Sequence, residues 1–475
     1  MKRYQFTWLL ILIVLFAIVL LTEGVEGKVN EESEIFLPFI SAPAGKWIAA
    51  YQWAYYDYEG RTLGLLEIGN NQYKLIGNEF VIYLKGDGKV DRAAFVTAAG
   101  GADAFIPLSE GRYVIGAEIW SDHCELKAAL FGEDDSTLWN RMVSLKGVDC
   151  GGGYNLSAGG DSIYLHHMFN NQRVSGYSSW LVRLDEKGDL AWSKLVGQDW
   201  LVGPFAMTTT AEGGLVFTAL RNGDIPTIIL AELNKSGQLE RAREFRPSSG
   251  SIYYVADAIV RTASQEYILV GSSSEGHFWA LKLDKDWKVS WQRHYKISLL
   301  PPGVLINLAI GLHDKGFLLG GILGANGNSY LLRIHSDGSL AWMRTFGSQQ
   351  RRISLNGVNE AGDGSILVAA SLQGDSTNYP LSMKLGPDGL VANCDLIRNE
   401  KIEVNELNLV ASPTTVAMQG ITAELQALDP GNMGPIEAGF DVLCSSGVTT
   451  SCEERGKQFL IGASKALDPA TIANR

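Results

Sequence analysis

The chain has 475 residues, of which 46% are hydrophobic and 19% charged, so it can bury a sizeable core and is not a disordered protein. Its 52 acidic and 40 basic residues give a net charge of −12, which argues against nucleic-acid binding, because that needs a basic face. Glycine is abundant at 53 residues, whereas 7 histidines and 5 cysteines leave little material for a metal or nucleophile centre.

The N-terminus has the pattern of an export signal. Lys2 and Arg3 precede the run 6–21, in which Thr7 is the only non-apolar residue. A secretory signal needs such a run, whereas a membrane-spanning helix usually needs about 20 apolar residues. We therefore expect residues 1–27 to be a cleaved signal peptide, with an uncleaved membrane anchor as the alternative, followed by a polar linker at 28–34. The protein is then secreted, periplasmic or at the cell surface.

One pattern recurs along the rest of the chain: an apolar strand, a turn usually centred on Gly, and a second apolar strand that often carries Trp. The copies lie at 80–92, 126–139, 180–192, 228–241, 278–291, 330–342 and 380–393, with a worn copy at 425–432. In the five strong copies the turn residues are spaced 49, 50, 51 and 51 residues apart, and they are Gly188, Gly237, Trp287, Gly338 and Gly389.

A second pattern alternates with the first: a small-residue strand, a polar turn and a strongly apolar strand. Its copies lie at 39–52, 104–119, 156–169, 206–220, 257–273, 307–323, 357–371 and 409–421. Each period thus holds four short strands, which is typical of a propeller blade that buries both faces by packing radially. We therefore predict an all-β fold, a β-propeller of four-stranded antiparallel blades over residues 35–445, with a polar C-terminal tail at 446–475.

The number of blades depends on the first and last copies. If 39–52 and 425–432 both count, there are eight copies of each pattern, and we expect eight blades with an insertion at 54–79. If the front copy is only a linker, the number falls to seven. The repeated tryptophans are interpreted as side chains that pack between adjacent blades, and they are Trp139, Trp192, Trp291 and Trp342.

The Leu-Asp-x-x-Gly-x-Leu-x-Trp pattern of 184–192, with a close copy at 334–342, resembles the tryptophan-docking repeats of quinoprotein-like β-propellers. It is similar, too, to the repeats of secreted bacterial propellers that have no known catalytic role. The resemblance covers about 400 residues and implies the fold rather than a function. Quinoprotein alcohol dehydrogenases also carry a disulfide between adjacent cysteines under the cofactor. No two cysteines are adjacent here, so the resemblance implies no cofactor-binding residue.

The sequence lacks the known catalytic and phosphate-binding motifs: Gly-x-Ser-x-Gly, His-Glu-x-x-His, Gly-Lys-Ser/Thr and Gly-x-Gly-x-x-Gly. His166 and His167 lie on a predicted strand, where neighbours point to opposite faces, so we expect one buried and one exposed imidazole rather than a metal site. The acidic residues at 87–91 and 284–286 lack a calcium-binding loop and are interpreted as turn residues. We therefore predict no catalytic, cofactor-binding or metal-binding residue.

All five cysteines lie in the exported part, where disulfides can persist. Cys124 and Cys150 flank one hairpin pattern and could link neighbouring strands. Cys394 and Cys444 lie one repeat apart and could tie the last two blades together. Cys452 is left over, and the pairings stay open because five cysteines allow fifteen ways of forming two bonds.

The best candidate for a recognition surface is aromatic. Tyr55, Tyr56 and Tyr58 follow the predicted front strand and offer rigid contact area for sugars or proteins. The alternative is that Tyr51 and the alternate residues after it form the buried face of a strand.

The sequence favours an exported, monomeric, non-catalytic scaffold that binds a protein or a polysaccharide. The alternatives are an enzyme acting on carbohydrate in the central funnel and a periplasmic envelope-assembly scaffold. Convergent carboxylates at the funnel mouth would favour an enzyme, whereas aromatic or mixed polar side chains would favour a binding protein.

Overall fold

The computed structural model describes most of residues 45–445. The described ranges are 45–53, 61–69, 71–96, 102–120, 124–146, 149–171, 176–196, 206–221, 226–248, 252, 254–262, 264–297, 304–324, 328–348, 351–373, 378–392, 394–414, 416, 418–420, 423–428, 433–435 and 438–445. Contacts divide the chain into residues 1–41 and 42–475, and every described residue belongs to the second unit. The expected signal peptide, linker and C-terminal tail lie outside the described residues. Within these ranges, no helix is long and apolar enough to cross a membrane.

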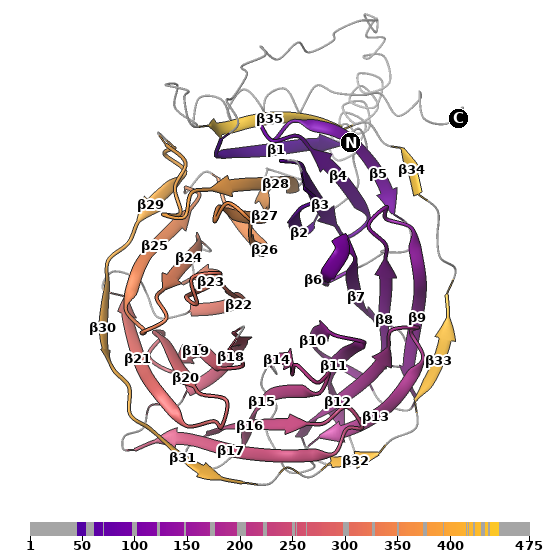
Figure 1. The fold of residues 1–475 in the computed structure, drawn as a ribbon, viewed down its shortest axis with the longest axis vertical. Helices are drawn as coiled ribbons and strands as arrows, with labels where there is room; N and C mark the ends of the chain where they lie inside the picture. Colours follow the sequence, from indigo (N-terminus) through magenta and orange to yellow (C-terminus); the bar gives the residue numbers. More distant parts are fainter. Residues whose placement is uncertain are drawn as a thin grey trace, which may run out of the picture. The chain divides into compact units, whose positions relative to one another are not determined.

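Seven antiparallel sheets form a ring of blades (Figure 1). Blade 1 consists of β2 (Thr62–Glu67), β3 (Tyr73–Gly77), β4 (Phe80–Leu84) and β5 (Val90–Val96). Blade 2 consists of β6 (Ala104–Pro107), β7 (Tyr113–Trp120), β8 (Cys124–Phe131) and β9 (Thr137–Leu145), with a short 3-10 helix at Ser109–Gly111. Blade 3 consists of β10 (Asp149–Gly159), β11 (Ser162–Asn171), β12 (Gly176–Asp185) and β13 (Leu190–Val196).

The next three blades repeat the arrangement, and the seventh takes its last strand from the start of the chain. Blade 4 consists of β14 (Met207–Thr209), β15 (Leu215–Arg221), β16 (Thr227–Leu233) and β17 (Leu239–Pro247). Blade 5 consists of β18 (Tyr254–Arg261), β19 (Tyr267–Ser273), β20 (Phe278–Leu283) and β21 (Val289–Ile297). Blade 6 consists of β22 (Val304–Gly311), β23 (Phe317–Leu323), β24 (Asn328–Ile334) and β25 (Leu340–Phe346). Blade 7 consists of β26 (Ile353–Glu360), β27 (Ile366–Gln373), β28 (Asn378–Leu385) and β1 (Trp47–Trp53).

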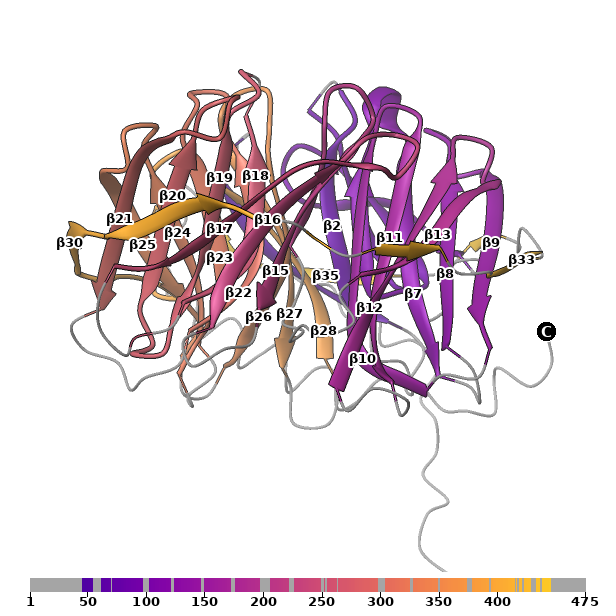
Figure 2. The ribbon, with the colours of Figure 1, turned by 90° about the horizontal axis from the view of Figure 1, so that it is seen from below.

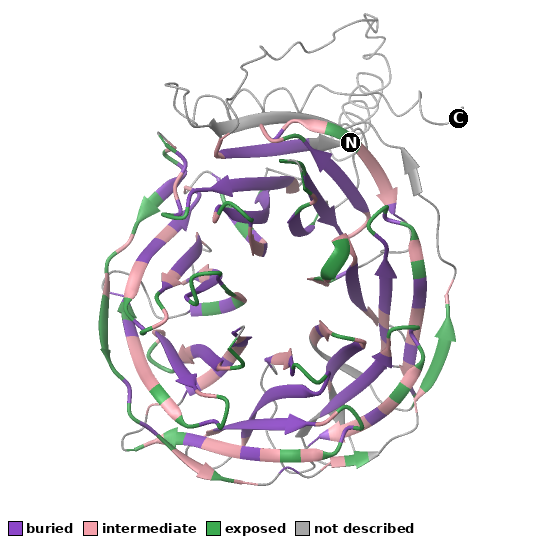
Figure 3. Ribbon diagram, in the orientation of Figure 1, coloured by how far each residue is buried: buried purple, intermediate pink, exposed green. Residues whose placement is uncertain are grey.

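The middle strands of each blade are mostly apolar because both of their faces are covered by neighbouring blades. All six residues of β20 are buried, and Figure 3 shows the same burial on the middle strands around the ring. The cores therefore lie between blades. Phe278 of blade 5 and Tyr330 of blade 6, for example, belong to one cluster, with ring centroids 4.9 Å apart.

Strand β1 closes the ring. It pairs with β28 in antiparallel register, with Trp47 opposite Lys384 and Ala50 opposite Leu381. Strand β2 of blade 1 then contacts β26 and β27 of blade 7, so the first and last blades pack together. The blade that closes the ring is thus built from both ends of the propeller sequence.

The structure has seven blades and corrects the expectation of eight. The front copy, 39–52, is not the start of a blade: its described part supplies β1, the fourth strand of blade 7. The expected insertion at 54–79 contains β2 and β3, which are ordinary strands of blade 1. The copies at 409–421 and 425–432 do not form a blade either, because their strands lie on the outside of other blades.

Those last strands belong to a belt, defined here as residues 394–445, which runs round the outside of the ring (Figures 1 and 2). Each belt strand pairs antiparallel with the outermost strand of one blade, in the order 6, 5, 4, 3, 2, 1 and 7. The belt strands are β29 (Ile397–Asn399), β30 (Ile402–Glu406), β31 (Leu409–Pro413), β32 (Met418–Gly420), β33 (Glu424–Ala427), β34 (Met433–Pro435) and β35 (Ala438–Ser445).

The belt is held mainly by backbone pairing and by scattered side-chain contacts. All five residues of β30 are exposed or half-buried, whereas Leu407 and Leu409 beside it are buried. Ion pairs join it to the blades, with 2.6 Å between Arg293 and Glu406 and 2.7 Å between Lys146 and Glu424. Because an exposed sheet edge invites pairing with another chain, the belt protects all seven blades at once.

Candidate functional site

The predicted recognition residues Tyr55, Tyr56 and Tyr58 lie outside the described residues, so their exposure stays a prediction. Tyr51, which precedes them on β1, is fully buried, and its hydroxyl donates to the carbonyl of Gly88 at 3.2 Å and is bonded to Ser382. Tyr51 is thus buried, as the alternative expects, but Trp47 to Ala50 are buried as well, so the described part of β1 does not alternate between a buried and an exposed face.

The repeated tryptophans lie at the joints between blades. Each sits on the fourth strand of one blade, covers the turn glycine of the next blade, and donates its indole N–H to the carbonyl two residues before that glycine. Trp342, for example, donates to Pro387 at 3.0 Å, and a Cβ at Gly389 would lie 2.8 Å from its ring. The other pairs are Trp47 with Gly88, Trp139 with Gly188, Trp192 with Gly237, and Trp291 with Gly338. Sequence reasoning missed Trp47 because the front copy, 39–52, aligns with the second pattern, whereas the repeated tryptophans belong to the first.

Two of the seven joints replace this pair. Between blades 4 and 5, Arg241 takes the tryptophan position and Trp287 the glycine position, with the guanidinium 4.1 Å from the indole centroid. Arg241 also donates to the carbonyl of Lys285 at 3.0 Å, the carbonyl that an indole would contact elsewhere. The exchanged pair therefore keeps both the stacking and the hydrogen bond of the other joints.

The second exception, between blades 1 and 2, encloses a charge pair. Lys74 and Asp135 are both fully buried, with Nζ 2.6 Å from Oδ1. Lys74 also donates to the carbonyl of Glu133 at 2.7 Å, and the hydroxyls of Tyr83 and Tyr113 donate to Asp135. Burial, with the neighbouring Asp135 carboxylate, raises the pKa of both phenols. This cluster is closed to solvent, so we interpret it as a structural joint rather than a binding site.

The expectation of one buried and one exposed imidazole in the histidine pair is wrong. His166 and His167 are both fully buried, because β11 is a middle strand covered on both faces. Burial lowers the pKa of His166 to about 3, and His167 Nε2 lies 2.9 Å from Glu118 Oε1. Over the part of the chain that the structure describes, no three His, Cys, Asp or Glu side chains gather as metal ligands.

The acidic turn residues bind their own backbones. Asp284 accepts N–H bonds from Asp286 and Lys288, both at 2.9 Å. Asp87 accepts from the backbone of Lys89 and pairs with its side chain at 3.0 Å. These contacts are the ones that the turn interpretation requires.

The innermost strands β2, β6, β10, β14, β18, β22 and β26 surround the ring axis (Figure 1). Among their described side chains, three are carboxylates: Glu67, Asp257 and Glu360. Glu67 accepts an N–H bond from Gly362 at 2.8 Å, and Glu360 accepts one from His313 at 2.6 Å. Two of the three carboxylates thus bind turns of the neighbouring blade.

The third carboxylate, Asp257, is in an unusual environment. It lies at a bulge in β18 and hydrogen-bonds with Ser272, but its Oδ2 is buried without a partner. Burial raises its pKa to about 6. The equivalent bulge of blade 7 carries Asn356, whose amide donates to Thr62 of blade 1 at 3.0 Å. The amide of Asn356 therefore finds hydrogen-bond partners at its bulge, whereas one oxygen of Asp257 has none at the equivalent bulge of blade 5.

An exposed apolar side chain also lies on the innermost strands. Leu305 of β22 is 61% exposed, and Asn307, two residues along, is exposed on the same face. On the adjacent β26, Ser354 is exposed and Asn356 is half-buried. We call these four residues the inner-strand patch. It is a mixed apolar, amide and hydroxyl surface, and it contains no carboxylate.

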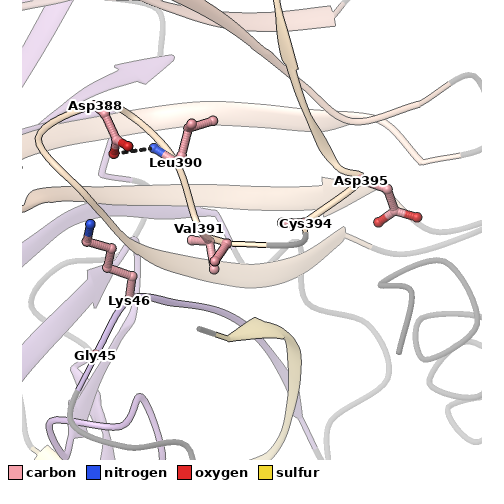
Figure 4. A pocket seen from close by; sticks show the side chains of 8 residues that line it. Gly45, Lys46, Asp388, Leu390, Val391, Cys394 and Asp395 are labelled. Atoms are coloured by element: carbon pink, nitrogen blue, oxygen red, sulfur yellow. Dashed lines mark hydrogen bonds between the residues drawn. The ribbon is translucent and has the colours of Figure 1, made fainter. Parts of the chain in front are cut away.

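A groove of about 830 Å³ lies at the ring closure (Figure 4). It forms because the chain after β28 cannot continue as a fourth strand, a place already taken by β1, and turns away towards the belt. Lys46 points towards the turn that carries Asp388, and Leu390 and Val391 line the same groove. Cys394 lines it too, at the first residue of the belt.

The cysteine pairs stay predictions, because the side chains of Cys150 and Cys444 lie outside the described residues. None of the described cysteines is a free thiol. Cys124 starts β8, and its sulfur lies 3.4 Å from His167 Nδ1. The backbone of Cys444 lies on β35, opposite Ile48 of β1.

No protein-family profile matches the sequence, and no curated protein matches it. Among solved structures, the Pan2 WD40 domain of Neurospora crassa is similar at 8% identity and a TM-score of 0.38, over 70% of this chain and 95% of that one. Trypanosoma rangeli sialidase in complex with the inhibitor DANA is similar at 11% identity and a TM-score of 0.39, over 73% of this chain and 60% of the sialidase chain. The AfRom2 CNH domain is similar at 10% identity and a TM-score of 0.39, over 70% of this chain and 98% of that one. All three are similarities of fold.

Proposed function

We propose that this protein is an exported, non-catalytic β-propeller that binds a protein or a polysaccharide through the inner-strand patch. The observation that carries the proposal is the exposure of Leu305 beside the polar side chains of Asn307 and Ser354. A partner can cover the apolar side chain while the amide and hydroxyl groups keep hydrogen bonds to its sugar hydroxyls or peptide groups. The predicted Tyr55, Tyr56 and Tyr58 cluster is a second contact surface in this proposal, provided that at least two of the rings are exposed.

Export is supported by the basic residues Lys2 and Arg3 and the apolar run 6–21 that follows them. We expect mature protein outside the cytoplasm as a monomer, with its N-terminus near Lys28. N-terminal sequencing of protein from each cell fraction tests this. Soluble cytoplasmic protein that retains Met1 would overturn the export part of the proposal.

Binding is tested with an array of purified polysaccharides and, in parallel, a displayed peptide library. The informative variant is Leu305→Asp, which places a charge in the patch. The matched control is Leu138→Asp, because Leu138 is also an exposed leucine, at 52%, but lies on β9, the fourth strand of blade 2. Losing one central apolar contact should weaken binding about tenfold or more in the first variant only. Equal binding by both variants would overturn the assignment of the patch.

The alternative, an enzyme acting on carbohydrate, is favoured by one observation: the carboxyl of Asp257, whose pKa burial raises to about 6, resembles a general acid in its protonation. Glycoside hydrolysis needs a second carboxylate facing the first across the bond to be cleaved. On the described innermost strands the other two carboxylates already bind turns. Turnover of chromogenic glycosides that is lost in Asp257→Asn would favour this alternative, whereas the binding proposal expects no turnover.

A further inference from the structure

The belt starts and ends at the same blade. Cys394, its first residue, lines the groove beside Lys46, which directly precedes β1 (Figure 4). After passing the six other blades, the belt ends with β35, which pairs with β1 in blade 7. The two ends of one continuous segment therefore meet after a full circuit of the ring.

Two cysteines mark these ends. Cys394 packs against the hydrophobic cluster that contains Ile48 of β1. The backbone of Cys444 lies directly opposite the same Ile48 in the β1–β35 register. Cys394 is not a free thiol.

We propose that Cys394 and Cys444 form a disulfide that closes the belt into a covalent hoop around all seven blades. The two thiols lose two protons and two electrons, and the acceptor is a disulfide such as oxidised glutathione, which is reduced to two thiols. The inference rests on the export part of the proposed function, because such a bond persists outside a reducing cytoplasm. The sequence-based expectation that this pair ties the last two blades together is thereby replaced, because Cys444 belongs to the belt and not to a blade.

The hoop dictates an order of events in folding. The closed loop would run from residue 394 to residue 444, with the whole ring inside it. Folded chains rarely pass through closed loops, so the bond has to form after the blades have closed and the belt has docked. A chain whose disulfide is kept while it is unfolded has to bring the ring through the loop before it can refold.

The hoop should also add stability. Cross-linking a loop of this length restricts the unfolded chain and changes the unfolding equilibrium constant on the order of a thousandfold. The gain should vanish on reduction, and the variants Cys394→Ala, Cys444→Ala and the double variant should lose the same amount. Cys452→Ala is the matched control and should unfold like the unaltered protein.

The experiment uses purified full-length protein, oxidised with glutathione disulfide and then digested without reductant for mass spectrometry. We expect one linked peptide that contains Cys394 and Cys444. A link from Cys394 to any other cysteine would overturn the proposal. Because the oxidant is added in vitro, this result does not depend on export or on ligand binding, so a failure here is distinct from a failure of the proposed function.

Refolding kinetics test the encirclement itself. Protein unfolded in guanidinium with the disulfide intact should refold about tenfold more slowly, or worse, than protein unfolded and reduced, because only the former has to pass through a closed loop. Equal refolding rates of the two forms would show that the bond does not close a loop around the ring and would overturn the hoop.

Discussion

At the scale of single residues, the joints show why two positions in different repeats have to match. Where the fourth strand carries Trp, the next blade has Gly, because the indole occupies the space of a Cβ and the turn needs a positive φ. Where Arg241 replaces Trp, the glycine position carries Trp287 at a φ of 63°. The spacing of the repeats predicts the tryptophans, but it cannot predict the arginine joint, because the contact that explains it lies in the next blade.

The two demands on a joint glycine can be separated within blade 7. Gly389 has a φ of 74°, and a Cβ there would also lie 2.8 Å from Trp342. Gly364 has a φ of 78°, but a Cβ there would lie 3.9 Å from its nearest neighbour, a side-chain atom of Pro387. We expect Gly364→Ala to cost about 1 kcal/mol from its backbone conformation alone, and Gly389→Ala about 2–4 kcal/mol. Urea unfolding of the two variants measures this difference, and equal losses would contradict a steric role for Trp342.

Asp257 predicts a pH dependence whose sign follows from its raised pKa. The folded protein holds the proton up to about pH 6, whereas the unfolded chain releases it near 3.8, the ordinary pKa of an aspartate side chain. The carboxyl therefore stabilises the fold fully below pH 3.8, and this contribution is lost as the pH rises through 6. Asp257→Asn removes the titration, and we expect it to be more stable than the unaltered protein at pH 7, by at most about 3 kcal/mol.

Urea midpoints of both proteins between pH 4 and pH 7.5 test this prediction. The asparagine that occupies the equivalent bulge in blade 7 indicates that the amide fits the site. A difference in stability that stays constant over this pH range would mean that burial of Asp257 does not govern it.

At the scale of elements, the sequence could not place two parts of the fold: strand β1 and the belt. Apolar runs at a fixed spacing predict the inner strands of the blades, because both faces of these strands are buried. The belt strands are three to eight residues long, and β30 and β33 carry mostly exposed side chains. Their position comes from backbone hydrogen bonds to blade edges, which leave no pattern in the side chains. The apolar residues at 409–421 and 425–432 therefore resemble weak copies of the blade repeat, although these residues form belt strands.

Removing the belt should expose seven sheet edges at once. A chain that ends after Val391 keeps all strands of the seven blades, including β1, but loses β29 to β35. We expect this variant to self-associate, because unpaired edges pair with one another, whereas a chain that ends after Ser445 should remain monomeric. Size-exclusion chromatography with light scattering distinguishes the two, and a monomeric, folded first variant would show that the belt does not protect the edges.

At the scale of the whole molecule, ring closure and the belt together explain why eight copies make seven blades. The first strand completes the last blade, so the front copy adds no blade, and the copies at 409–421 and 425–432 supply belt strands. The described part of the front copy contributes the fourth strand of the blade whose other strands lie at 353–385. The fold class and the positions of most hairpins could be predicted from spacing. The hairpin of β2 and β3 could not, because 54–79 does not fit the repeat pattern, and the blade number required knowing which strand crosses the closure. The same holds for the candidate site, since the inner-strand patch combines β22 and β26, which are neighbours only in the ring.

The closing joint should therefore respond differently from the others when its tryptophan is removed. Trp342→Ala should cost about 3–5 kcal/mol, because it empties a buried joint between blades 6 and 7, and an unchanged melting temperature would contradict the packing role. Trp47→Ala removes a fully buried ring that donates to Gly86 at 3.2 Å and lies 6.0 Å from Tyr73. The free energy of unfolding should fall by at least as much in Trp47→Ala as in Trp342→Ala.

The two variants differ in where the ring loosens. Trp342 lies within a continuous chain, so its removal should leave β1 protected from hydrogen exchange. Trp47 lies on β1, which β28 and β35 alone hold as strand partners, so its removal should let β1 detach and open the ring. Hydrogen exchange should then rise together in β1, β28 and β35 of the Trp47→Ala variant. If exchange rises in the same strands for both variants, the first strand is not what closes the ring.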